Sequence, residues 1–230
     1  GAVNALEKVK DEALVLYLTK SFRCSQEISE IANNYLTIVE APKEFIGNDD
    51  VIDDEADYKQ DAIIARSNSQ LFSYAAFQTG EKKLFFVGGI NSYNFTDLVD
   101  LVRLKYDNDR EKIKNSFFKL FNNLDDLKDY ALSANEQEIL SKIKVSMSVP
   151  KLSTELWNLK QRTVKKEEDA EVILTTAHKS KGLEWDSVTL LKGFTDLTKD
   201  DVEQEEVNLL YVAITRAKKR LKVRLNWLVL

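Results

Sequence analysis

The feature that most constrains the fold is a series of short apolar runs, separated in most cases by segments with helical periodicity. The runs are rich in β-branched and aromatic residues, which predicts strands at 13–19, 62–66, 84–87, 172–176, 187–191 and 221–225. Residues 25–39 and 206–217 each place their apolar side chains on one helical stripe. Strands that alternate with helices are typical of a parallel sheet flanked by helices. We therefore predict an α/β fold.

One long stretch breaks this alternation. Between residues 104 and 166 we find helix-like segments at 109–122, 125–132 and 135–144, followed by a polar run that begins at Gln161. We predict a small, mostly helical insertion at 104–166, within a sheet domain made of residues 1–103 and 167–230.

Composition excludes several classes of protein. The chain has 230 residues, 43% of them hydrophobic and 31% charged, which is enough for one good core. No run approaches the ~18 apolar residues of a membrane helix, and the amino terminus has no targeting pattern, so we expect no membrane partner. Because Gly1 leads directly into a helix-like segment without a methionine, we interpret the chain as part of a longer protein.

The chain's single cysteine and single histidine limit metal binding, and its net charge limits nucleic-acid binding. One cysteine, Cys24, cannot form an internal disulfide, and with one histidine, His178, it leaves too few ligands for a zinc site. We expect no metal bound by this chain. A formal charge of -5 and a pI near 5.2 argue against a broad basic surface for nucleic acid, but they allow a narrow DNA groove.

The most informative stretch is 172–188, VILTTAHKSKGLEWDSV. Its strand is followed by Thr176, His178 and Lys179, then by Gly182 and Glu184. Ligands bind at the carboxyl ends of strands in open α/β sheets, lysines there can meet phosphates, and a glycine lets the backbone approach a ligand. On these residues alone, a polar connecting loop that happens to contain lysines is an equally good interpretation.

A second stretch, 205–221 (EEVNLLYVAITRAKKRL), has the pattern of an amphipathic helix that ends in a basic cluster. Capping of the helix dipole accounts for Lys218 and Lys219. It accounts less well for Arg216, because a planar donor fork suits a phosphate.

A third stretch, 18–27 (LTKSFRCSQE), places Phe22 and Arg23 after a predicted strand and before a helix. An aromatic ring beside an arginine can stack on a base while the arginine reaches a phosphate. A core phenylalanine next to a surface charge is the alternative, and these residues alone do not decide between the two.

Together, these three stretches resemble motifs IV, V and VI of the UvrD/Rep-like superfamily 1 DNA helicases, in the same order. The segments 62–77 (AIIARSNSQLFSYAAF) and 87–104 (VGGINSYNFTDLVDLVRL) extend the resemblance. Four short motifs are most similar to those of the F-box DNA helicase branch. They are SFR, VGGI, AHKSKGLE and NLLYVAITRAKKRL. The resemblance implies the carboxy-terminal region of such a helicase, a second RecA-like domain.

The resemblance implies a role for several residues in ATP chemistry. Arg23 and Arg216 match arginine fingers that reach the ATP γ-phosphate from across a domain cleft. Phe22 matches the aromatic residue that stacks on the adenine, and Gly182 and Glu184 match a nucleotide-binding segment whose glutamate contacts the ribose.

A second set matches positions near single-stranded DNA in the family. It consists of Arg66, Asn68, Tyr93, Thr176, His178 and Lys179. Two of these have open alternatives, since Tyr93 follows a glycine pair and is as easily a core residue, and a lone histidine is more often packed or exposed than functional.

The implied cofactors are ATP and Mg²⁺, both held mainly by an upstream P-loop domain of the same protein. The chain itself has no GxxxxGK[ST] loop, so we expect it not to hydrolyse ATP alone. The implied activity is 3′–5′ movement on single-stranded DNA, in the cytoplasm with the nucleoid if the source is bacterial and in the nucleus if it is eukaryotic. The alternatives are a non-enzymatic module that binds single-stranded DNA or a protein, and part of a RecB-type helicase–nuclease.

Overall fold

The computed structural model describes Leu16 and residues 19–38, 43–52, 58–106, 110–197 and 202–224. The strand predicted at 13–19 lies almost entirely outside the described residues. The strand predicted at 221–225 falls within a longer strand as far as residue 223, and residue 225 is outside the described part.

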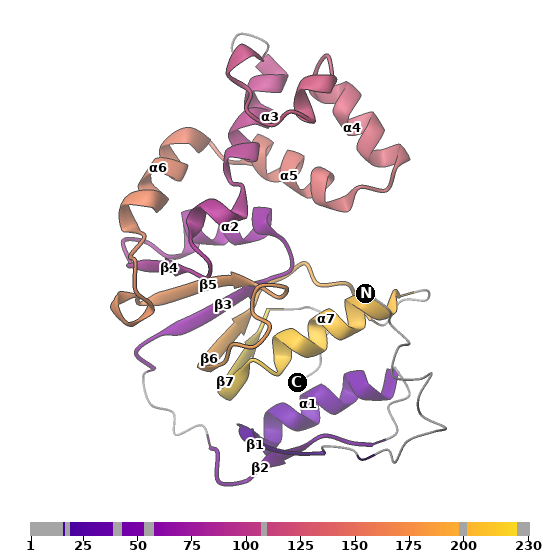
Figure 1. Ribbon diagram of the computed structural model, residues 1–230, viewed down its shortest axis with the longest axis vertical. Coiled ribbons are helices and arrows are strands. Elements are labelled where there is room, and N and C mark those ends of the chain that lie inside the picture. The colour runs from indigo at the N-terminus through magenta and orange to yellow at the C-terminus, as the bar shows by residue number, and fades with distance from the viewer. Residues whose placement is uncertain are drawn as a thin grey trace.

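In the described part of the chain, five parallel strands form the main sheet (Figure 1). In spatial order they are β4 (Leu84–Phe86), β5 (Val172–Thr176), β3 (Asp61–Ala65), β6 (Trp185–Leu190) and β7 (Ala217–Val223). The prediction of a parallel α/β sheet is therefore confirmed. The strands predicted at 62–66, 84–87, 172–176 and 187–191 all form; the ends of 172–176 match, and those of the others differ by at most two residues.

The strand register defines two opposite edges of the sheet. At the carboxyl edge, the last residue of β5, Thr176, lies beside Ala65 at the end of β3. At the amino edge, Trp185 at the start of β6 lies beside Ala217 at the start of β7. Loops at these two edges lie on opposite sides of the molecule, so each edge can build a separate site.

Each face of the sheet is covered by helices. One face packs against α1 (Gln26–Ile38) and α7 (Gln204–Ile214), and the other packs against α2 (Asn68–Gln78) and α6 (Leu152–Arg162) (Figure 1). Successive strand residues point to opposite faces, so Ile64 joins the first of these cores and Ile63 the second. Both are almost fully buried, and each buried isoleucine contributes about 1.5–3 kcal/mol.

A smaller parallel pair, β1 (Lys20–Ser25) and β2 (Ile46–Asn48), lies beside α1 and close to β7 (Figure 1). The sequence predicted that a strand ends before Phe22 and Arg23. This was wrong, because both residues lie inside β1. As a result their side chains follow strand alternation and leave β1 on opposite sides.

Away from the sheet, α3 (Thr96–Tyr106), α4 (Leu124–Ser133) and α5 (Gln137–Ser148) pack around a third apolar cluster. The helices predicted at 125–132 and 135–144 are confirmed as α4 and α5. The division into residues 1–103 and 167–230 with an insertion at 104–166 stays a prediction. Within that range, α6 packs on the same face of the sheet as α2.

The helix predicted at 109–122 was wrong. Over the described residues 110–122, the chain forms only two short 3-10 turns, Arg110–Lys112 and Phe118–Leu120. The buried carboxylate of Asp100 accepts hydrogen bonds from the backbone N–H groups of residues 114 and 115, at 2.8 and 2.9 Å. The side chain of Asn115 accepts those of residues 117 and 118. Side-chain acceptors thus take the donors that a helix would have used.

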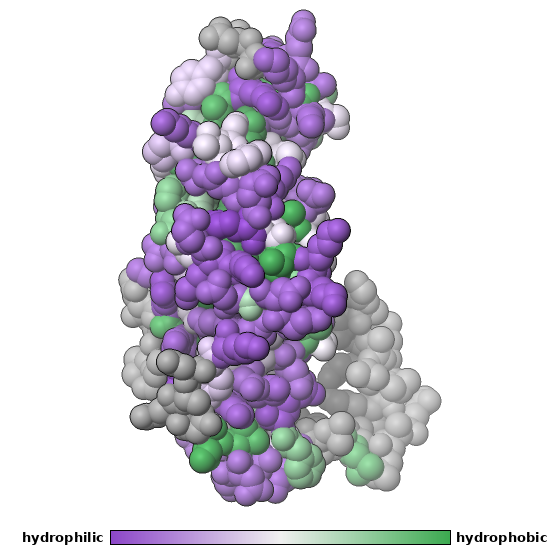
Figure 2. Space-filling model, turned by 90° about the vertical axis from the view of Figure 1, so that its left-hand side faces the viewer, coloured by the Kyte–Doolittle hydropathy of each residue, from purple (hydrophilic) through white to green (hydrophobic). Residues whose placement is uncertain are grey.

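The side of the molecule that carries α6 and β4 has a mainly hydrophilic surface, with apolar residues only in separate patches (Figure 2). The edge strand β4 is partly covered, because the backbone N–H of Val164 donates to the carbonyl oxygen of Leu84. A short, covered edge resists pairing with another chain. Among the described residues, no helix is long and apolar enough to cross a membrane.

Candidate functional site

The predicted site residues fall into two groups at opposite edges of the sheet. Arg23, Glu184 and Arg216 lie together at the amino edge, and we call them the amino-edge cluster. Arg66, Asn68, Thr176, His178 and Lys179 line one cavity of about 770 Å³ at the carboxyl edge, which we call the carboxyl-edge groove. The resemblance had assigned these residues to an ATP set and a DNA set, but the sequence did not place the two sets at opposite edges of the sheet.

The loop at residues 177–184 connects them. It leaves β5 at the carboxyl edge and enters β6 at the amino edge, because both strands run parallel to β3. Gly182 has φ of +83°, a conformation that L side chains rarely adopt, and no atom lies within 4 Å of the position a Cβ would take. The turn therefore favours glycine at this position, and the close approach of the backbone to a ligand stays a prediction.

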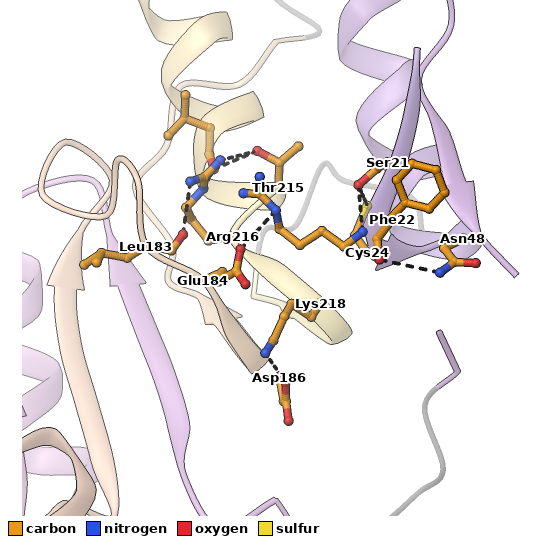
Figure 3. Close-up of polar contacts among 12 residues, drawn as sticks. Ser21, Phe22, Cys24, Asn48, Leu183, Glu184, Asp186, Thr215, Arg216 and Lys218 are labelled. Atoms are coloured by element: carbon orange, nitrogen blue, oxygen red, sulfur yellow. Dashed lines mark hydrogen bonds and ion pairs between the residues drawn. The ribbon is translucent and has the colours of Figure 1, made fainter. Parts of the chain in front are cut away.

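Arg23 reaches from β1 to the loop before β6. Its Nε lies 3.0 Å from a carboxylate oxygen of Glu184, and the two side chains are 50% and 42% exposed. Figure 3 shows Glu184 beside Arg216, with the Lys218–Asp186 ion pair next to them. The cluster is therefore open to solvent on one side.

Arg216 follows α7 and is held by hydrogen bonds to its surroundings. Its Nε donates to the carbonyl oxygen of Val212 at 2.9 Å, one Nη donates to that of Leu183 at 3.0 Å, and the other donates to the hydroxyl of Thr215 at 3.1 Å (Figure 3). A guanidinium has five N–H donors, and two of those of Arg216 have no acceptor among the residues that the structure describes. These contacts fix the plane of the group.

The electrostatics of the cluster favour an anion. Burial lowers the pKa of Arg216 from its ordinary value, and the positive charge of Arg23 lowers it further. An arginine nevertheless stays charged at neutral pH. Two guanidinium groups face one carboxylate, that of Glu184, so the cluster carries an excess positive charge that a phosphate would neutralise.

Phe22 is not brought into this cluster. Its ring is 78% exposed and points away from Arg216, and Lys20 Nζ lies 5.7 Å from the ring centroid (Figure 3). An exposed ring on the neighbouring strand is free to stack on a planar group. The structure thus places Phe22 at the side of the cluster.

In the carboxyl-edge groove, Arg66 forms a bidentate ion pair with Glu206 in the first turn of α7. The Nε of Arg66 donates to one carboxylate oxygen at 2.9 Å, and one Nη donates to the other at 2.5 Å. Hydrogen bonds from Arg66 lower the pKa of Glu206, and the nearby positive charge and a hydrogen bond from Thr195 add to the effect. The sequence pattern placed Glu206 on a helix and assigned it no role. An acidic residue in the first turn of a helix is already explained by the helix dipole, so nothing in the sequence indicated an ion pair with the distant Arg66.

The other groove residues differ in their exposure. Thr176 is 5% exposed at the end of β5, and His178 is exposed in the loop that follows. Lys179 Nζ lies 5.0 Å above the ring of Tyr93. Asn68, the first residue of α2, is half-buried.

Tyr93 is a core residue, so its predicted DNA contact was wrong. Its side chain is fully buried, stacks on Phe95 at 5.6 Å between ring centroids, and donates from its hydroxyl to the carbonyl oxygen of Val87 at 2.8 Å. Burial raises its pKa well above the ordinary range. The ring therefore has no free face for a base, and Lys179, which lines the groove, lies over it.

The five-stranded parallel sheet with helices on both faces has the α/β architecture of a RecA-like domain, and a cationic cluster lies at its amino edge. The chain belongs to the UvrD-like helicase C-terminal domain family, whose profile matches residues 91–226. This range contains Glu184 and Arg216 but not Arg23 or Arg66. Within the described residues, no group of three or more His, Cys, Asp or Glu side chains could hold a metal ion.

Two curated relatives support the same family. The F-box DNA helicase 1 of Gallus gallus is 30% identical over 247 aligned positions, which cover 95% of this chain and 24% of that protein. The F-box DNA helicase protein 1 of Schizosaccharomyces pombe (strain 972 / ATCC 24843) is 44% identical over 77 positions, or 29% of this chain and 9% of that protein. The chain spans about a quarter of the length of the chicken relative. The predicted family is therefore confirmed.

Proposed function

We propose that the chain is the carboxy-terminal half of an ATP-dependent DNA helicase that moves 3′ to 5′ along a single strand. The observation that carries the proposal is the meeting of Arg23, Glu184 and Arg216 at the amino edge of the sheet. Three separate segments of the sequence supply these side chains. Their excess positive charge suits a polyphosphate.

In this proposal, Arg23 and Arg216 are arginine fingers. Arg216 is oriented by its bonds to Leu183, Val212 and Thr215, so it needs little reorganisation to meet the charge that develops on a transferring phosphoryl group. Glu184 accepts from the ribose hydroxyls, and Phe22 stacks on the base. Mg-ATP supplies the phosphoryl group and is held mainly by an upstream P-loop domain.

Single-stranded DNA would occupy the carboxyl-edge groove. Thr176 and His178 lie at one end of the 177–184 loop and Glu184 at its other end, so a movement of this loop would be felt at both sites. α7 makes a second connection, because Glu206 lies at its start and Arg216 follows its end. These two elements give a physical route by which nucleotide and DNA binding affect each other.

The test is DNA-stimulated ATPase activity, measured for a protein that carries the chain with an upstream P-loop domain and for the 230-residue chain alone. We expect turnover only in the longer protein, stimulated by single-stranded DNA. An oligonucleotide duplex with a 3′ or a 5′ single-stranded tail would then report the direction of movement. Absence of turnover in both proteins would favour the non-enzymatic binding module. Because both relatives come from eukaryotes, we also propose a nuclear location.

A further inference from the structure

The carboxyl-edge groove is poor in positive charge for a DNA site. Its described lining contains the cations Arg66 and Lys179 but three carboxylates, Glu138, Glu203 and Glu206. Arg66 is moreover already paired with Glu206. Because affinity for nucleic acid comes largely from phosphate neutralisation, this groove alone would hold a strand weakly.

A second groove adjoins it. This α2–α5 groove has a volume of about 650 Å³ and lies between α2, α5 and the ends of β6 and β7. Gln70, Gln137 and Ser141 line both grooves, so the two are continuous. Figure 1 shows α2 and α5 as neighbours on the side of the sheet away from α7.

The α2–α5 groove has the opposite charge. Its described lining contains Lys144, Lys192 and Arg224 and no acidic residue. All three cations are exposed. In a chain with a formal charge of -5, an acid-free groove with three cations is a local exception that favours a polyanion.

The groove also carries two aromatic rings. Phe77 on α2 is 53% exposed, which is unusual for a phenylalanine. One helical turn earlier, Tyr74 lies under the guanidinium of Arg224, 5.6 Å from carbon to ring centroid. An exposed ring and a guanidinium stacked on a ring are both surfaces on which a base can stack.

We propose that the α2–α5 groove is a second binding surface for single-stranded DNA, which continues the strand's path beyond the carboxyl-edge groove. This rests on the proposed function above. Lys144 and Lys192 pair with phosphates, Phe77 stacks on a base, and the Arg224–Tyr74 pair supplies both a charge and a platform. These contacts read no base edge, so binding is independent of sequence, as a translocating protein requires.

The experiment measures fluorescence anisotropy of the chain with labelled oligothymidylates of about 4 and about 12 nucleotides at low salt. The shorter one can occupy one groove at a time, and the longer one can span both. For the longer one, we expect Lys144→Glu/Lys192→Glu to weaken binding about tenfold or more and to lower the salt slope by roughly one. We expect Phe77→Ala to weaken it by about tenfold. The unchanged chain should bind the longer one more tightly than the shorter one, because only the longer one reaches both grooves.

Matched controls lie on elements that line neither groove. Lys119→Glu/Lys160→Glu makes the same change in net charge, and Trp157→Ala removes another exposed aromatic side chain, one that is 60% exposed on α6. Because all these positions are exposed, thermal unfolding should be similar in every variant.

Three outcomes would overturn the proposal. The first is unchanged affinity of the groove variants for the longer oligonucleotide. The second is an equal loss of affinity in the control variants. The third is binding of polyglutamate that depends on Lys144 and Lys192, together with no effect of Phe77→Ala, because this combination would indicate an acidic protein partner. If the unchanged chain binds neither oligonucleotide, the DNA contact in the proposed function fails too. The results therefore separate the two claims.

Discussion

Arg23 Nε and a carboxylate oxygen of Glu184 lie 3.0 Å apart, which joins the small strand pair to the loop that leads into the main sheet. Both side chains are about half exposed, so solvent screens the pair and it adds little to stability. Its effect is positional. It holds Arg23 next to Arg216, where two positive charges would otherwise repel each other.

Replacement of Arg216 tests the arginine-finger assignment. In the longer protein with its P-loop domain, Arg216→Ala should lower ATP turnover by about 10³-fold or more, because the charge it aims at the phosphoryl group is lost. Affinity for single-stranded DNA should change little, since the carboxyl-edge groove lies at the opposite edge of the sheet. Lys218→Ala is the matched control, since it loses only the partly exposed pair with Asp186. Normal turnover in Arg216→Ala would reject the assignment.

Glu184→Ala should act mainly on nucleotide binding. Loss of the carboxylate removes a ribose acceptor, so we expect a higher KM for ATP. It also removes the ion pair that holds Arg23 near Arg216, so kcat at saturation should fall too, but by less, because Arg216 keeps its own hydrogen bonds. The measurement is steady-state ATPase activity over a range of ATP concentrations. An unchanged KM would contradict the ribose contact.

Tyr93→Phe tests the corrected role of Tyr93 as a core residue. The variant keeps the ring but loses the hydroxyl that donates to Val87, so we expect a loss of stability of about 1 kcal/mol and unchanged oligonucleotide affinity. Urea unfolding and anisotropy measure the two quantities. If affinity fell while stability did not, Tyr93 would contact DNA after all.

Local sequence patterns were enough to predict most of the sheet. Ile63 and Ile64 lie in an apolar run too short for a helix, and Val172–Thr176 is similar, so period and length indicated buried strands. The segment 109–122 shows the limit of such patterns. Its apolar residues have helical spacing, but two of its backbone N–H groups, those of residues 114 and 115, donate to the carboxylate of Asp100 on α3. A contact between distant segments leaves no local signal.

The same limit applies to the site. The resemblance to helicase motifs assigned Arg23, Glu184 and Arg216 to one predicted ATP site, and in the structure their side chains lie together. The separation of the two edges, the partner of Arg66 and the α2–α5 groove depend on register and on helix packing, which no single segment specifies. For Phe22, the predicted strand boundary was wrong, and with it the expected direction of the ring. Strand alternation sends its ring away from Arg23, but the strand was predicted to end before it.

The ion pair between Arg66 and Glu206 should make stability depend on pH. Its hydrogen bonds lower the pKa of Glu206 below the ordinary value of 4.5, so the unfolded chain binds a proton at a higher pH than the folded one. The contribution is fully present above that ordinary value and is lost as pH falls through the lowered pKa. At pH 7, Glu206→Gln should cost about 1–3 kcal/mol, because a neutral amide accepts more weakly from Arg66.

The difference between Glu206→Gln and the unchanged chain should shrink as pH falls below 4.5, because protonated Glu206 then resembles the glutamine. Urea unfolding of both proteins at pH 7 and at successively lower pH measures this difference. Lys142→Met provides a contrast, since it breaks the Asp97 and Glu138 pairs but leaves Glu206 intact. In a Lys142→Met background, the Glu206→Gln difference should show the same pH dependence. A difference that did not vary with pH would mean that Glu206 stabilises the fold by packing and not by its charge.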